Sequence, residues 1–118
     1  MPTLDELRET CAALPHSRET FPFDMTTLVF KVGGKMYALT SIDAQQPSVS
    51  LKVKPEYGEE LRLEYPAITP GYHLNKRHWV TVNMDGSVPD ELVHELVRGS
   101  HALVVKGLTR AQREELGL

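Results

Sequence analysis

A diglycine between two β-rich runs is the feature that most constrains the fold of this chain. Residues 27–32 and 35–40 are rich in Val, Leu, Phe, Tyr and Thr, and Gly33 and Gly34 separate them. Because glycine readily adopts the positive φ of a two-residue turn, this pattern predicts a tight antiparallel hairpin. Apolar and polar residues alternate in residues 48–54, which predicts a third strand with a cationic outer face.

Helical spacing and capping residues predict four helices around these strands. They lie between Thr3 and Pro15, Pro55 and Pro66, Ser87 and Gly107, and Thr109 and Leu116. Residues 79–83 read as a further strand, residues 67–76 as a loop, and residues 21–23 as an edge strand or an extended connector. The order predicts an α+β fold, with an antiparallel β-sheet and helices packed on one face.

Length and composition favour one domain over residues 1–118. Hydrophobic residues make up 41% of the chain and charged residues 25%, as in ordinary globular proteins. Cys11 is the only cysteine and cannot form an internal disulfide. The N-terminus has no signal-peptide pattern, and no apolar run approaches the roughly twenty residues of a membrane helix. We therefore expect a cytoplasmic protein without membrane contact.

Positive charge gathers in the middle of the chain although the formal net charge is −3. The predicted strands carry four lysines: Lys31, Lys35, Lys52 and Lys54. The turn-rich run 71–79 adds six candidate binding residues: His73, Asn75, Lys76, Arg77, His78 and Trp79. Lys and Arg bind phosphate, Asn can read a base edge and an indole can stack on a base. We therefore expect nucleic-acid or anion binding by these ten residues.

Other interpretations of the same residues remain open. Strand lysines also protect exposed sheet surfaces from aggregation, and a lone Trp such as Trp79 often anchors a core. The histidines lack a second ligand pair at a zinc spacing, and Cys11 lies on the apolar stripe of the first predicted helix. Glu59-Glu60 reads as a solvated helix face. We therefore expect no metal, no cofactor and no catalytic residue.

Four segments resemble the MmcQ/YjbR family, which is described as having a double-wing DNA-binding motif and a fold related to the CyaY-like superfamily. They are residues 21–24, 28–39, 51–55 and 70–79, and the last, Pro-Gly-Tyr-His-Leu-Asn-Lys-Arg-His-Trp, is the most specific. The resemblance implies a curved antiparallel sheet with helices on one face. It also implies DNA binding, by analogy of fold.

Our first hypothesis is a small non-enzymatic DNA-binding protein that uses a basic sheet face and the loop from His73 to Trp79. The alternative is a module that binds a protein partner or an anionic small molecule with the same loop. An enzyme that uses His73 or His78 as a general acid or base is the least supported class, because no partner residue is evident.

Overall fold

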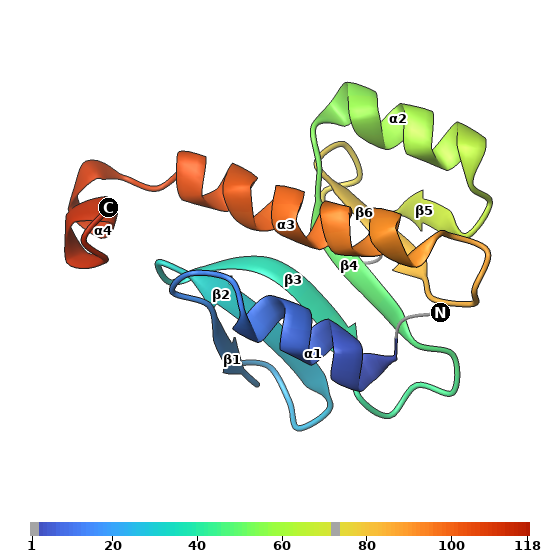
Figure 1. The fold of residues 1–118 in the computed structure, drawn as a ribbon, viewed down its shortest axis with the longest axis horizontal. Coiled ribbons are helices and arrows are strands. Elements are labelled where there is room, and N and C mark those ends of the chain that lie inside the picture. Colours follow the sequence, from blue (N-terminus) through green and yellow to red (C-terminus); the bar gives the residue numbers. More distant parts are fainter. Residues whose placement is uncertain (1–2, 72–73) are drawn as a thin grey trace.

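The computed structural model describes residues 3–71 and 74–118, and six strands form one antiparallel sheet in the order β1-β2-β3-β4-β6-β5 (Figure 1). The strands are β1 (Arg18–Thr20), β2 (Thr27–Val32), β3 (Lys35–Ser41), β4 (Ser48–Lys52), β5 (Ile68–Pro70) and β6 (Trp79–Asn83). The helices are α1 (Leu4–Ala12), α2 (Pro55–Glu64), α3 (Asp90–Lys106) and α4 (Arg110–Glu115). The fold is therefore α+β, as the sequence predicts.

The β2–β3 hairpin confirms the prediction from the diglycine. Gly33 and Gly34 have φ values of 59° and 78°, and β2 pairs with β3 in antiparallel register. The register shifts between Phe30 and Lys31, so that Tyr37 lies in a β-bulge and packs its ring 6.3 Å from that of Phe30. The bulge sends this aromatic pair into the core.

Helices cover one face of the sheet (Figure 1). Helix α3 crosses β2, β3 and β4, α1 packs beside α3, and α2 lies over β5 and β6. The sheet supplies this core with inward side chains that include Leu28, Phe30, Val49, Leu51, Val80 and Val82. The alternation in residues 48–54 correctly predicts that Val49, Leu51 and Val53 share the buried side.

Ser100 fastens α3 to the centre of the sheet. Its hydroxyl is fully buried, donates to the carbonyl of Tyr37 and accepts a 2.8 Å hydrogen bond from the Lys52 backbone N–H. One helical side chain thereby binds backbone groups of both β3 and β4. This contact positions α3 relative to β3 and β4.

Two short strands differ from the prediction. The first strand covers Arg18–Thr20, before Phe21, and β5 (Ile68–Pro70) lies inside the segment expected to be loop. Each has three residues and pairs with one neighbouring strand, β1 with β2 and β5 with β6. Strands this short carry too little periodicity to be recognised without their partners.

None of the helices in the described ranges is both long and apolar enough to cross a membrane.

Candidate functional site on the open face of the sheet

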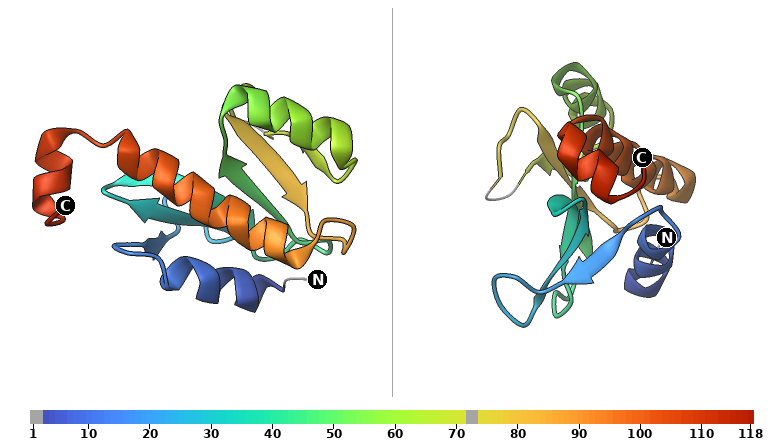
Figure 2. Two further views of the ribbon diagram at one scale, coloured as in Figure 1. Left: turned by 45° about the horizontal axis from the view of Figure 1, so that its top comes forward. Right: turned by 90° about the vertical axis from the view of Figure 1, so that its left-hand side faces the viewer.

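The sheet has a second face that none of the described helices covers (Figure 2). In the right-hand view α1 and α3 lie on one side of the sheet, whereas the light-blue β1–β2 loop and the yellow β5–β6 loop project from the other. We call this second face the open face. Strand register and alternation with the core residues assign it these strand positions: Arg18, Thr20, Thr27, Val29, Lys31, Met36, Leu39, Ser41, Ser48, Ser50, Lys52, Thr69, Trp79, Thr81 and Asn83.

A cationic row crosses the open face near the β2–β3 turn. Arg18 pairs with Lys31 and Lys31 with Met36, while Lys52 pairs with Trp79 on the far side of β3. Lys31 and Lys52 each lie one residue beyond the paired residues Phe30, Ala38 and Leu51, and β3 runs between them. None of the described strand positions on this face is acidic. We call Arg18, Lys31, Lys52 and Trp79 the cationic row.

A groove continues from the cationic row between the two loops. It encloses about 500 Å³, with Phe23 from the β1–β2 loop and Leu74 from the β5–β6 loop among its walls. Its floor combines apolar and hydroxyl side chains, including Met36, Leu39, Ser41, Ser48, Ser50 and Thr81. The Ser50 and Thr81 hydroxyls are 2.9 Å apart and hydrogen-bonded to each other. The groove therefore offers both apolar contact and hydrogen bonding.

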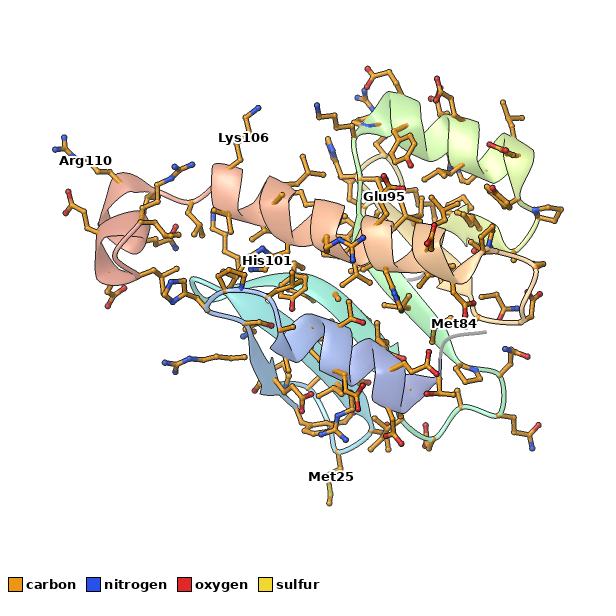
Figure 3. The ribbon with its side chains drawn as sticks, viewed as in Figure 1. Met25, Met84, Glu95, His101, Lys106 and Arg110 are labelled. Carbon is orange, nitrogen blue, oxygen red and sulfur yellow. The ribbon has the colours of Figure 1, made fainter. Side chains whose placement is uncertain are left out.

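Asp24 organises the β1–β2 loop. Its Oδ1 accepts hydrogen bonds from the backbone N–H groups of Thr26 (2.9 Å) and Thr27 (2.6 Å). These hydrogen bonds lower the pKa of Asp24 below its ordinary value, and the bond from Thr26 has the largest effect. The ordered loop leaves Phe23 71% and Met25 87% exposed, and Met25 points away from the domain (Figure 3).

Backbone contacts close the β5–β6 loop at its base. The Gly71 N–H donates to the Trp79 carbonyl over 2.9 Å, and the Trp79 N–H donates to the Asn75 carbonyl over 3.0 Å. A Cβ on Gly71 would lie only 2.7 Å from Trp79 Cβ, so the close approach requires glycine. The Asn75 Oδ1 accepts from the Arg77 N–H over 2.9 Å, which makes Asn75 a turn residue. The Lys76 ammonium lies 3.3 Å from the Gly71 carbonyl.

The predicted binding residues therefore fall into three groups. Lys31, Lys52 and Trp79 lie on the open face. Asn75, Lys76, Arg77 and His78 belong to the loop beside it, and His73 lies outside the described residues.

Lys35 and Lys54 lie elsewhere, so the expectation of one face for all strand lysines is wrong. Lys35 pairs with core-facing Val32, and its ammonium lies 3.5 Å from the Gly107 carbonyl at the end of α3. Lys54 is the N-cap of α2 and lines a cavity between α2 and α3. The bulge after Phe30 and the start of α2 redirect these two side chains, and neither event is visible in simple alternation.

Trp79 lies outside the hydrophobic core, so the core-anchor interpretation is wrong for this residue. It is half-buried on the open face and alternates with Val80, which is 1% exposed within the core. Sequence reasoning missed Arg18 and Phe23 as site residues. Phe23 belongs to a segment that resembles the family, but placing Arg18 on the site requires the β1–β2 register.

Most acidic residues lie on helices, and two acidic residues, Glu19 of β1 and Glu115 of α4, line a pocket together with Arg18 and Lys31. Of the sixteen Asp and Glu residues, three are on α1, four on α2, three on α3 and two on α4. The helical layer is thus acidic and the open face cationic. Such a separation orients a protein toward a polyanion even when its net charge is slightly negative.

The described part of the chain offers little for covalent or metal chemistry. Burial raises the pKa of the Cys11 thiol to about 12, so the thiol stays protonated under ordinary conditions. Within residues 3–71 and 74–118, no three His, Cys, Asp or Glu side chains converge as a metal-binding group.

Fold and site together define a two-layer α+β protein with helices on one sheet face and two loops bracketing the other. The YjbR family model matches residues 12–103, and the chain belongs to this family. The "Uncharacterized protein YjbR" of Escherichia coli K12 is 36% identical over 114 residues, covering 97% of both chains. The "Uncharacterized protein YbdF" of Escherichia coli O157:H7 is 35% identical and covers 87% of this chain and 84% of its own.

Solved structures share the same architecture. The crystal structure of Deinococcus radiodurans protein DR2400, with a DUF419 domain, has a TM-score of 0.92 and 61% identity, covering 100% of this chain and 90% of its own. A crystal structure of a Pseudomonas syringae protein has a TM-score of 0.74 and 27% identity, covering 86% of this chain and 97% of its own. The six-stranded sheet with its helical layer therefore recurs among similar proteins.

Proposed function

We propose that this protein binds DNA as a single strand along the open face of its sheet, without catalysing a reaction. The observation that carries the proposal is the cationic row, in which Arg18, Lys31 and Lys52 lie at one level across the sheet with Trp79 at its end. Ammonium and guanidinium groups bind phosphates, and the face of a partly exposed indole is a surface on which a base can stack.

The groove favours a single strand over a duplex. Its floor is a sheet between two loops, and it presents Met36, Leu39 and paired hydroxyls to a ligand. Unstacked bases fit such a mixed surface, because their faces are apolar and their edges form hydrogen bonds. No described helix lies on this face, whereas a reader of the major groove usually inserts a helix or a two-stranded ribbon.

The β5–β6 loop would add phosphate contacts. Lys76 and Arg77 are exposed beside the groove wall formed by Leu74, and His78 directly precedes Trp79. Phosphate oxygens reaching this wall would meet two further cations. Replacing both Lys76 and Arg77 by Ala should therefore weaken binding strongly at low salt.

A protein partner is the second candidate, supported by one observation. Phe21, Phe23 and Met25 are 45%, 71% and 87% exposed in one loop, and clustered exposed apolar side chains often mark protein interfaces. A partner of this kind would bind with little salt dependence, because apolar contact would dominate.

The test is fluorescence anisotropy with a labelled oligothymidine and, in parallel, a duplex of equal length. For the proposed function we expect tighter binding of the single strand. The slope of log K against log salt should be negative, and its magnitude should fall by about 0.7 for each phosphate-contacting cation removed. Absence of binding to either DNA at micromolar protein and low salt would refute the proposal, and salt-independent binding would favour an apolar mode.

A further inference from the structure

A second cavity lies on the opposite side of the sheet, between α2, α3 and the end of β4. It encloses about 470 Å³, which falls within the roughly 300–1,000 Å³ of small-molecule sites. Val53, Leu96 and Leu103 are apolar lining residues, and Tyr57 of α2 also lines the cavity. The labelled Glu95 and Lys106 both leave α3 on the side where α2 lies (Figure 3).

The side of this cavity that α3 forms carries unusually small side chains. Gly99 lies in the interior of α3, where glycine costs about 1 kcal/mol relative to alanine. A Cβ at this position would meet no atom within 4 Å, so no packing contact in the described structure requires glycine here. Ala102, a small residue one turn further on, also lines the cavity. Together Gly99 and Ala102 leave an open apolar surface on an otherwise amphipathic helix.

Charges are divided between the two ends of the cavity. Lys106 closes α3, and Glu95 lies eleven residues earlier, about 16 Å along the helix at 1.5 Å per residue. Lys54 adds a second cation at the N-cap of α2, where no side chain caps the helix. The exposed N–H groups of such a terminus also favour an anion. An apolar trough with cations at one end is complementary to a ligand with an apolar body and an anionic head.

The geometry points to a binding site for a small amphipathic carboxylate, with its chain along Gly99 and Ala102 and its carboxylate at Lys54 and Lys106. Lys52 belongs both to the cavity lining and to the cationic row, and no other residue of the cationic row lines the cavity. The inference does not depend on DNA binding. Ser100 forms part of its wall but already donates to Tyr37 and accepts from Lys52, so it supports the wall without serving the ligand.

The test titrates the ¹⁵N-labelled full chain with octanoate, followed by amide chemical shifts. We expect saturable shifts confined to the residues that line the cavity. Gly99→Leu would fill the trough and should weaken octanoate binding at least tenfold. Ala111→Leu adds an apolar side chain on exposed α4, and it should leave octanoate binding unchanged.

Charge is tested separately with the double variant Lys54→Glu/Lys106→Glu and with 1-octanol as the uncharged probe. The double variant should weaken octanoate at least tenfold and leave 1-octanol unchanged. The inference fails if octanoate shifts no cavity signal, if Gly99→Leu binds it as well as the parent chain, or if octanoate and 1-octanol respond alike to the double variant. Oligothymidine affinity measured with and without octanoate should be equal, so loss of DNA binding alone would leave this inference standing.

Discussion

Lys52 of β4 lies directly opposite Trp79 of β6, and both side chains are on the open face of the sheet. The backbone N–H of the same Lys52 donates to Ser100 of α3 on the other side. One residue therefore connects the helical layer, through its backbone, with the candidate DNA surface, through its ammonium.

Trp79 should report DNA binding directly, because it is the only Trp of the chain and is half-buried on the open face. Stacking of a base on the indole should quench its fluorescence as oligothymidine is added. Trp79→Leu should weaken binding by about 1–3 kcal/mol, and Trp79→Phe, which keeps an aromatic ring, by less. A full anisotropy change without any change in Trp emission would contradict a stacking role.

Ser100→Ala should destabilise the fold by about 1–3 kcal/mol, because the Lys52 N–H and the Tyr37 carbonyl lose a buried partner. The measurement is the free energy of unfolding in urea. Ser87→Ala removes an exposed hydroxyl that bonds Asp85, and it should change stability by no more than about 0.5 kcal/mol. Equal losses in the two variants would contradict the role assigned to Ser100.

Two Gly→Ala substitutions should have opposite effects on stability. In Gly71→Ala the new Cβ would lie 2.7 Å from Trp79 Cβ and 3.2 Å from Leu74 Cβ, so overpacking should cost about 1–3 kcal/mol. In Gly99→Ala nothing lies within 4 Å, and better helix propensity should add up to about 1 kcal/mol. Thermal or urea unfolding of both variants checks this pair, and stabilisation by Gly71→Ala would show that the loop base is less tightly packed than described.

Acid should loosen the β1–β2 loop through Asp24. Hydrogen bonds from Thr26 and Thr27 lower the folded-state pKa of Asp24, so its contribution to loop order is present above the ordinary carboxyl pKa near 3.9. That contribution should be lost as pH falls through the lower folded value. The amide signals of Thr26 and Thr27 followed by NMR should titrate below the ordinary carboxyl range. In Asp24→Ala this transition should vanish, and a midpoint above pH 4 in the parent chain would be the opposite of this expectation.

The sequence predicts the sheet centre well because its signals are local. Gly33 and Gly34 define a turn by backbone freedom alone, and the alternation of Val49 and Leu51 follows from the two-residue period of a strand. The sequence does not predict strand β5, because its three residues are held by pairing with residues of β6 that lie 10 to 14 positions further along the chain.

The candidate site is only partly predictable for the same reason. Lys31 and Lys52 follow strand alternation and lie where it places them, whereas Lys35 and Lys54 follow a bulge and a helix start. Arg18 joins the cationic row only because it pairs with Lys31. The sequence near Arg18 does not specify this pairing, because Lys31 lies on another strand. Asn75 looks like a base reader by residue type, but its Oδ1 is engaged in the turn that positions Arg77.

The most direct measurement compares two double variants that each remove two positive charges, but from different places. Lys31→Ala/Lys52→Ala takes two cations from the open face, and Lys35→Ala/Lys54→Ala takes two from positions off it. In anisotropy titrations with oligothymidine at low salt, the first should lose at least tenfold in affinity and the second should bind nearly as the parent chain does. Equal losses, or a larger loss from Lys35→Ala/Lys54→Ala, would contradict a DNA-binding surface on the open face of the sheet.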